Sequence, residues 1–321
     1  MAERKRRLRV RVPATIANLG PGFDSLGMAL ELANTLDFTW QGIASGSEAE
    51  GPGEISFSVS GEGCEEIPPG AENLVLTAAQ RVWERAGRRP TSAHVHLENR
   101  IPLARGLGSS AAAIVGGLVG ANALVGSPLT PEELLPLAVE LEGHPDNVLP
   151  ALRGGITVGF ALEGEKGRIR ALSLPPPRHL AVVVAVPEFP LSTLRARGVL
   201  PHSVPFSDAV FNVSRASFLV AALALGRLED LGAAMADRLH QPYRAPLVPG
   251  LSQVLAEAQR AGAYGSALSG AGPSVMAFTP PERSQAVGKA MQEAFAAHQI
   301  TCRIIITRPA RVGARVERMT E

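Results

Sequence analysis

The segment that most constrains this chain is residues 101–117, IPLARGLGSSAAAIVGG. Gly106 and Gly108 flank a leucine, two adjacent serines follow, and an apolar run of small residues comes next. Glycines allow a tight turn, and a helix opened by such a turn presents unpaired N–H groups and partial positive charge at its first residues. This combination is typical of an anion site, and phosphate is the first ligand that it suggests.

The stretch that follows the turn carries no charge from residue 107 to residue 129, so a membrane span is the alternative to a buried helix. Ser109, Ser110, Asn122 and several glycines make it weakly apolar for a span, and we predict a buried helix from Ser110 to about residue 125. The basic head runs into an alternating pattern and does not resemble a signal peptide. We therefore expect a cytoplasmic protein.

The overall charge argues against several classes of protein. Lysine and arginine number 31 and aspartate and glutamate 30, so the chain lacks the basic excess of a nucleic-acid binder. We expect no nucleic-acid and no membrane partner. Cys64 and Cys302 lie far apart without histidines at ligand spacing, which predicts neither a disulfide framework nor a zinc site.

Alternation and turn residues predict the elements of the first half. Residues 4–11 are basic, and the alternation of arginines with Leu8 and Val10 favours a strand over a basic binding arm. We predict strands at 7–16, 36–40, 55–61 and 92–99, helices at 73–87, 110–125 and 130–143, and loops at 18–27 and 42–54.

Three prolines at 175–177 precede a continuous apolar run at 180–186, and there we place a domain boundary. The predicted domains are residues 1–174 and 175–321. In the second, the pattern predicts helices at 208–226, 227–240, 251–261 and 281–298, paired strands within 262–279, and a strand at 301–309. This order favours a two-layer α+β domain of ferredoxin-like arrangement.

Three nucleotide motifs compete for residues 102–112. The P-loop of ATPases requires a lysine after its last glycine, and Ser109 stands there instead. The dinucleotide fingerprint is met formally by Gly106, Gly108 and Ala111. It should follow an apolar strand directly, however, and here an alternating strand and four polar or proline residues precede it.

The third motif takes the whole run, Pro-x-x-x-Gly-Leu-Gly-Ser-Ser-Ala-Ala, which resembles the phosphate loop of the GHMP kinases, small-molecule kinases named for galactose, homoserine, mevalonate and phosphomevalonate. PATIANLGPGFDSLGMAL (13–30) and SALSGAGPSVMAF (266–278) resemble the first and third motifs of that family. The resemblance implies an α+β, two-domain GHMP kinase fold, with an N-terminal ribosomal-protein-S5-domain-2-like α/β domain and a C-terminal ferredoxin-like domain. It also implies ATP as co-substrate and Mg²⁺.

The resemblance carries nucleotide-binding roles onto particular positions of this chain. Asn73 matches a residue of the base pocket, and its alternative role is to cap the helix that follows. The implied nucleotide-binding residues are Asn73, Pro102, Leu103, Ala104, Arg105, Gly106, Leu107, Gly108, Ser109, Ser110, Ala111, Ala112 and Gly270.

NLGPGFD, EGHPDN, a Thr-x-x-x-Arg and PYR resemble, within this family, the kinases that phosphorylate L-homoserine to O-phospho-L-homoserine in threonine biosynthesis. Homoserine is a zwitterion, and arginine is the better partner for its carboxylate because the guanidinium binds two oxygens at once. The resemblance implies Arg197 and Arg244 for the carboxylate and Asp24 for the ammonium. The implied substrate-binding residues are Asn18, Asp24, His144, Asp146, Asn147, Thr193, Arg197 and Arg244. Asn18 with Asp24 also fits a simple Asx-turn, and residues 144–146 a simple turn.

The metal and catalytic roles rest on oxygen ligands, which Mg²⁺ prefers. Glu142 matches the metal-binding glutamate of the family, with Ser109 and Ser110 as hydroxyl ligands, and the short connection to His144 leaves Glu140 as an alternative. We assign Ser110, Glu142 and Asn147 to catalysis. No catalytic base is assigned, because phosphoryl transfer depends mostly on alignment and charge stabilisation; Asp146 is the alternative.

Two other functions stay open from the sequence. A kinase of the same family with another acceptor, such as mevalonate, would leave Asp24 without an ammonium to bind. A catalytically silent sensor could lose its metal ligands, yet Ser109, Ser110 and Glu142 are all present. The expected partners are L-homoserine and ATP, and a homodimer is one open assembly.

Overall fold

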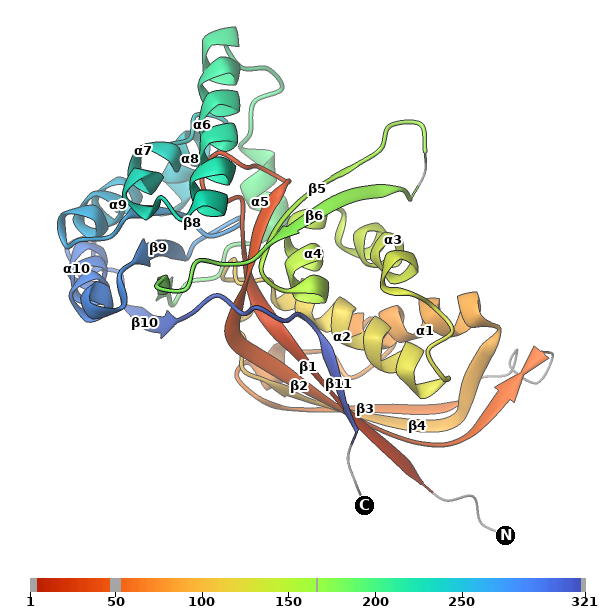
Figure 1. Cartoon of the computed structure of the whole chain (residues 1–321). Helices are drawn as coiled ribbons and strands as arrows, with labels where there is room; N and C mark the ends of the chain where they lie inside the picture. The colour runs from red at the N-terminus through yellow and green to blue at the C-terminus, as the bar shows by residue number, and fades with distance from the viewer. Residues whose placement is uncertain (1–4, 47–52, 166, 319–321) are drawn as a thin grey trace.

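The computed structural model describes residues 5–46, 53–165 and 167–318. Two sheets organise these residues, one of seven strands and one of four (Figure 1). Arg4 of the basic head and residues 47–52 of the predicted loop 42–54 lie outside the described residues.

The large sheet has the order β11-β1-β2-β4-β3, and β5 and β6 extend it from β2. Among the strands described for this sheet, only β3 and β4 run parallel, and the other pairs are antiparallel. The strands are β1 (Arg6–Ala17), β2 (Leu26–Ser45), β3 (Glu54–Gly61), β4 (Arg88–Asn99), β5 (Ile156–Ala161), β6 (Ile169–Leu174) and β11 (Arg315–Arg318). The predicted strands are confirmed, but β2 is longer than expected. It pairs with β4 as far as Ser45, so the loop predicted to begin at Gly42 is strand at its start.

Helices α1 (Leu74–Ala86), α2 (Ser109–Leu124) and α4 (Pro145–Arg153) pack on one face of the large sheet, and α3 (Pro131–Glu142) packs on these helices (Figure 1). Helix α2 is mostly buried, as predicted, and its glycines set how closely it approaches the strands. A Cβ on Gly120 would lie 2.2 Å from the ring of Phe38, and one on Gly116 would lie 2.7 Å from Leu36. The uncharged stretch is therefore the core helix of this layer.

Local signals set the ends of α1 and α3 as the sequence predicted. Thr130 and Glu133 form a reciprocal capping box at the start of α3, and Gly143 ends this helix with positive φ. The side chain of Asn73 accepts hydrogen bonds from the first N–H groups of α1, and Gly87 closes the helix.

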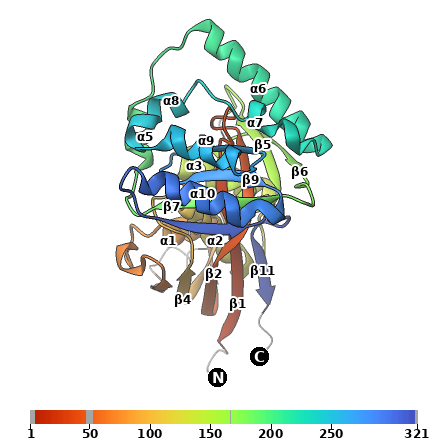
Figure 2. The same ribbon diagram turned by 90° about the vertical axis from the view of Figure 1, so that its left-hand side faces the viewer.

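The small sheet has the order β10-β7-β9-β8, in which all pairs are antiparallel. Its strands are β7 (Ala181–Pro187), β8 (Gly265–Leu268), β9 (Val275–Thr279) and β10 (Cys302–Thr307). Helices α9 (Leu251–Arg260) and α10 (Ser284–Ala296) pack on one face of it (Figure 2). The order and the split β-α-β pattern are those of the predicted ferredoxin-like arrangement.

The predicted helix 227–240 is wrong. Only η3 (Leu228–Asp230) and α7 (Leu231–Ala234) are helical there. The carboxylate of Asp237 accepts hydrogen bonds from the backbone N–H groups of Leu239, His240 and Gln241. Short polar side chains often compete in this way with the hydrogen bonds of a helix. The chain therefore turns here into the separate short helix α8 (Gln241–Arg244).

Helix α6 (Phe206–Leu225) follows α5 (Thr193–Gly198) and projects from the small-sheet side of the molecule (Figure 1). Of the described helices, it alone is long and apolar enough to cross a membrane by length and composition, and 22% of that window is buried. It is fastened to the fold by Asn212, whose side chain binds Pro21 O and Asp237, and by buried Leu219 and Leu223.

After β10 the chain returns to the first sheet, where β11 pairs with β1 at its outer edge (Figure 1). Strand β6 ends at Leu174 and β7 begins at Ala181, so the boundary that we predict after residue 174 falls between the sheets. That division into 1–174 and 175–321 stays a prediction. The remaining 3₁₀ turns are η2 (Cys64–Glu66), η4 (Ala245–Leu247) and η5 (Pro281–Arg283).

Candidate active site

A cavity of about 360 Å³ gathers nearly all of the predicted site residues, although they come from distant parts of the sequence. It is lined by the loop before α2, the starts of α1, α4 and α5, the loop between β1 and β2, and the turn at Gly270. Every predicted residue lines it except Pro102, Ala111 and Ala112. The last two are fully buried in the core, where their side chains hold α2 in place and do not line the cavity.

The loop before α2 needs its two glycines both for backbone conformation and for space. Gly106 and Gly108 have φ of 72° and 66°. A Cβ on Gly106 would lie 2.2 Å from the carbonyl oxygen of Ser269, and one on Gly108 would lie 1.9 Å from Thr15 Oγ1. Gly108 precedes the first turn of α2 without a side-chain cap, so N–H groups of that turn are free to bind an anion.

The three motifs meet through hydrogen bonds. Ser269 Oγ donates to Gly106 O at 2.6 Å. Thr15 N donates to Leu107 O at 3.1 Å, and Gly270 N donates to Ala17 O at 3.1 Å. The first and third motifs therefore brace the phosphate loop from both sides, a contact that their separation in sequence does not reveal.

Ser110 and Glu142 form the acidic corner of the cavity. Ser110 Oγ donates to Glu142 Oε1 at 2.8 Å, and burial raises the pKa of Glu142. Glu140 is exposed and does not line the cavity, so geometry favours Glu142 between the two candidates. The hydroxyls of Ser109 and Ser110 with this carboxylate form a set of hard oxygen donors beside an anion-binding helix end, which fits Mg²⁺.

The segment His144 to Asn147 opens helix α4, so the alternative of a simple turn is wrong. His144 Nδ1 pairs with Asp146, which is 2% exposed. Burial acts to lower the pKa of His144, but the bond to Asp146 and the nearby carboxylates outweigh it, and the pKa is raised. Asn147 accepts a hydrogen bond from Thr15 Oγ1 at 2.7 Å, which fixes its amide beside the phosphate loop.

Asp24 and Arg197 pair with each other, which the sequence did not predict. Arg197 donates through Nη2 to Asp24 Oδ1 at 2.6 Å and through Nη1 to Oδ2 at 3.0 Å. Asp24 has φ of 56°, and its N–H donates to Asn18 Oδ1 at 3.0 Å. This bond spans six residues and closes the whole loop, so it is not the two-residue Asx turn that was the alternative, and Asp24 lies in the cavity.

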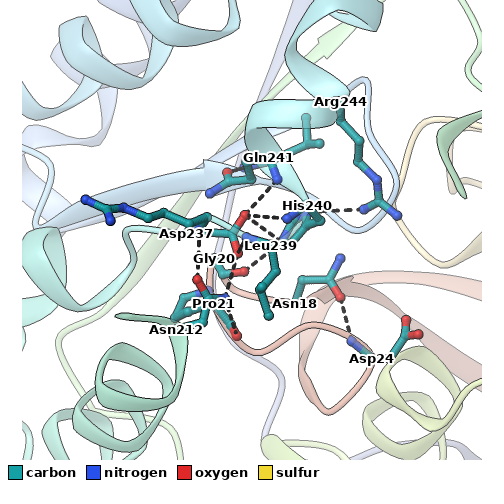
Figure 3. Close-up of polar contacts among 12 residues, drawn as sticks. Asn18, Gly20, Pro21, Asp24, Asn212, Asp237, Leu239, His240, Gln241 and Arg244 are labelled. Carbon is teal, nitrogen blue, oxygen red and sulfur yellow. Dashed lines mark hydrogen bonds and ion pairs between the residues drawn. The ribbon is translucent and has the colours of Figure 1, made fainter. Parts of the chain in front are cut away.

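Arg244 is 2% exposed, yet it lines the cavity. Its Nε donates to Ala196 O at 3.1 Å and its Nη1 to Gly270 O at 3.0 Å; His240 Nδ1 lies 3.3 Å from Nη1 (Figure 3). Burial and then the Arg197 cation lower the pKa of Arg244 to about 10, so it remains charged at neutral pH.

Asp24, His144 and Asp146 place one ligand atom each within 4.8 Å of one another, a spacing that could also hold a metal ion. Asp24 is engaged by Arg197, however, and Asp146 by His144. Glu142 therefore stays the predicted metal ligand, and these three residues stay predicted for substrate.

Asn73 caps α1 and also lines the cavity. Its Oδ1 accepts from Val75 N at 2.9 Å and its Nδ2 donates to Pro68 O at 2.6 Å, so both ends of the amide are in use. The sequence analysis missed Asn34 and Asn99, which line this region and bond to each other at 2.8 Å. A buried asparagine within an alternating strand was the signal that could have identified them.

Comparison with known proteins agrees with the motifs. The family described as GHMP kinases N terminal domain matches residues 73–155, and GHMP kinases C terminal matches residues 219–297. A homoserine kinase of Carboxydothermus hydrogenoformans is 50% identical over 306 residues, covering 95% of each chain. One of Moorella thermoacetica is 50% identical over 307 residues, covering 96% of this chain and 99% of the relative.

Solved structures give the same result. The crystal structure of homoserine kinase from Cytophaga hutchinsonii matches with a TM-score of 0.85 at 30% identity, covering 99% of both chains. A mevalonate kinase of L. major matches with a TM-score of 0.68 at 16% identity, over 93% of this chain and 95% of that one, which shows a shared fold alone. The chain therefore belongs to the GHMP kinase family and, within it, to the homoserine kinases.

Proposed function

We propose that this chain transfers the γ-phosphoryl group of ATP to the side-chain hydroxyl of L-homoserine, giving O-phospho-L-homoserine and ADP. The observation that carries the proposal is the layout of one cavity. Asp24, Arg197 and Arg244 lie at its amino-acid end, and the phosphate loop with Ser110 and Glu142 lies at its phosphate end. We place the reaction in cytoplasmic threonine biosynthesis.

The amino-acid end suits a zwitterion. Arg244 has three of its five N–H donors engaged, and its Nη2 has no acceptor among the described residues. This nitrogen can bind a carboxylate, while Asp24 and the partly exposed Arg197 can exchange their mutual contacts for the ammonium and the second carboxylate contact. Thr193, at the start of α5, lines the same end.

The phosphate end suits a nucleotide with a divalent cation. The first turn of α2 offers N–H groups to the phosphates, and Ser109, Ser110 and Glu142 would hold Mg²⁺. When bound, the ion neutralises charge that develops on the phosphate oxygens. The apolar side chains of Ile67, Val75 and other residues of the cavity lie beside Asn73, where the base would pack.

Between the two ends, Asn147 can orient the acceptor hydroxyl. Its Oδ1 is fixed by Thr15, and its Nδ2 lies 3.4 Å from Asp146 Oδ1, so the amide has little freedom to rotate. A loose transition state needs this alignment more than it needs a strong base, and we assign none.

The proposal is tested by measuring ADP release with L-homoserine, mevalonate, galactose and shikimate. Turnover with homoserine alone is expected. Equal turnover of mevalonate would favour the other acceptor class, and binding of homoserine without turnover would favour the silent sensor. Asp24→Asn should weaken the binding of homoserine more than the binding of ATP, because only homoserine carries an ammonium.

We also propose that two chains associate through α6. Phe206, Val213 and Leu225 are 84%, 67% and 74% exposed, and with Val210 and Phe218 they give this helix a large exposed apolar surface. Sedimentation should show a dimer that Val213→Asp with Phe218→Asp dissociates. A wild-type chain that sediments as a monomer at all concentrations would refute it.

A further inference from the structure

His240 is completely buried and makes a directed contact through each ring nitrogen, although no motif of the sequence identified it. Its Nε2 lies 2.7 Å from Gly20 O, and its Nδ1 lies 3.3 Å from Arg244 Nη1 (Figure 3). The first contact reaches the loop that carries Asp24, and the second reaches the buried arginine of the amino-acid end.

These contacts define one protonation state. A carbonyl oxygen only accepts, so Nε2 must carry the hydrogen that binds Gly20. A guanidinium only donates, so Nδ1 must be the unprotonated acceptor for Arg244. The neutral Nε2–H tautomer satisfies both partners at once. Burial lowers the pKa of His240, which also favours the neutral ring.

The contact with His240 matters because it selects which donors of Arg244 remain free. The three engaged N–H groups are that of Nε and both of Nη1, and they leave the two on Nη2. Without the Nδ1 acceptor, a second hydrogen of Nη1 would be buried without a partner. The side chain would then gain by rotating away from its present direction.

His240 itself is held from behind. Asp237 accepts the N–H of His240 at 3.0 Å and also receives Asn212 Nδ2 from helix α6 at 2.8 Å (Figure 3). The ring of Phe23 lies 5.2 Å from the imidazole, and Arg244 Cζ lies 5.3 Å from the same phenyl ring. Histidine, arginine and the Asp24 loop therefore form one packed unit.

We propose that His240 is a positioning residue for substrate recognition. Its neutral Nδ1 orients Arg244 so that Nη2 faces the substrate carboxylate, while its Nε2–H fixes the loop that carries Asp24. This inference rests on the proposed function, because it assigns to Arg244 the carboxylate of an amino-acid substrate.

Two conservative variants separate the two contacts. A glutamine at 240 can reach Gly20 with its Nε2–H but removes the Nδ1 acceptor, whereas an asparagine can place an oxygen near Nδ1 but cannot reach Gly20. We expect His240→Gln to raise the KM for L-homoserine about 10- to 100-fold, the loss for one hydrogen bond to a charged group. The KM for ATP should stay within about threefold of wild type. His240→Asn keeps an acceptor for Arg244 and loses only the contact with Gly20, so it should raise the homoserine KM less than His240→Gln does.

A double-mutant cycle distinguishes positioning from a general loss of structure. In the background of Arg244→Leu, His240→Gln should add no further increase in the homoserine KM, because its effect passes through Arg244. The preference of wild type for homoserine over 3-aminopropan-1-ol, which lacks the carboxylate, should likewise fall with His240→Gln. Additive effects, or a glutamine variant that keeps both the KM and the preference, would overturn the proposal.

Folding is monitored by thermal melting of each variant. If His240→Gln does not fold, His240→Asn still tests the proposal. A well-folded His240→Asn enzyme whose homoserine KM is as high as that of Arg244→Leu would contradict the role of the Nδ1 acceptor. A wild-type enzyme that phosphorylates a different acceptor refutes the proposed function instead, so the two failures are distinguishable.

Discussion

Gly108 is a position in the phosphate loop where even one added methyl group should disturb the site. The substitution Gly108→Ala adds that group. The backbone there has φ of 66°, and the added Cβ would lie 1.9 Å from Thr15 Oγ1 and 3.0 Å from Asn147 Oδ1. Those two oxygens already share a hydrogen bond of 2.7 Å. The methyl group must therefore displace either the loop or the amide that we assign to the acceptor hydroxyl.

The cost has two parts. A left-handed conformation costs an alanine about 1–2 kcal/mol relative to glycine, and forcing an extra methyl group into a packed site costs about 1–3 kcal/mol more. We expect Gly108→Ala to lower the free energy of unfolding by roughly 2–5 kcal/mol. Gly87→Ala is the matched control, because Gly87 has φ of 60° and nothing lies within 4 Å of its added Cβ. The control should show only the first part.

Urea denaturation of both variants measures these free energies, and steady-state kinetics with ATP and L-homoserine measures their activity. Gly108→Ala should lose at least about tenfold in kcat, the equivalent of 1.4 kcal/mol in the barrier, while Gly87→Ala should keep the wild-type kcat. Equal destabilisation by the two variants would refute the claim of a clash. A Gly108→Ala enzyme with normal kcat would refute the dependence of catalysis on this close approach.

Four further outcomes are expected. Glu142→Gln should reduce kcat about 100-fold, as for loss of one charge-stabilising group, with an unchanged melting temperature, whereas Glu140→Gln should leave kcat intact. Arg244→Leu should raise the homoserine KM about 10- to 100-fold and remove most of the preference for substrates with a carboxylate, without changing the KM for ATP. Thr130→Ala should cost about 0.5–2 kcal/mol of stability in urea and nothing in kcat. Burial lowers the pKa of His240, which lies among the charges of Asp237, Arg244 and Asp24. Its contribution to stability should therefore fall as pH drops below about 6.5, where the unfolded chain binds the proton first. Urea denaturation over a pH series should show a weaker dependence of the unfolding free energy on pH for His240→Gln than for wild type.

Local sequence rules predicted the elements that local forces stabilise. Two helices have ends at the expected residues, because their capping groups lie within one turn of those ends. The capping residues are Thr130 and Glu133 for α3, and Asn73 and Gly87 for α1. The same rules failed at residues 227–240. Their apolar spacing favours a helix, but the carboxylate of Asp237 takes the N–H groups of residues 239–241.

The members of the site were predicted by motif resemblance, but their contacts depend on tertiary structure. Ser269 braces Gly106 across 163 residues of sequence, and Thr15 holds Asn147 across 132. No local pattern specifies such a pair. His240 shows the same limit more clearly, since a single histidine next to a glutamine carries no motif, and only burial with two directed contacts identifies it.

The pairing of Asp24 with Arg197 has a consequence for how an amino acid enters. The sequence assigned these residues to opposite charges of the substrate, and in the structure each already neutralises the other. The side chains are each 35% exposed, and partly exposed ion pairs contribute only about 0–1 kcal/mol. Exchanging this pair for the ammonium and carboxylate of homoserine therefore costs little. Before substrate binds, this pair keeps Arg197 from standing as an unpaired cation beside the buried cation of Arg244. The two cations repel each other, and the carboxylate of Asp24 opposes that repulsion. Asp24 thus serves the empty site as well as the occupied one, because its carboxylate offsets the charge of Arg197 beside Arg244 before the substrate carboxylate arrives.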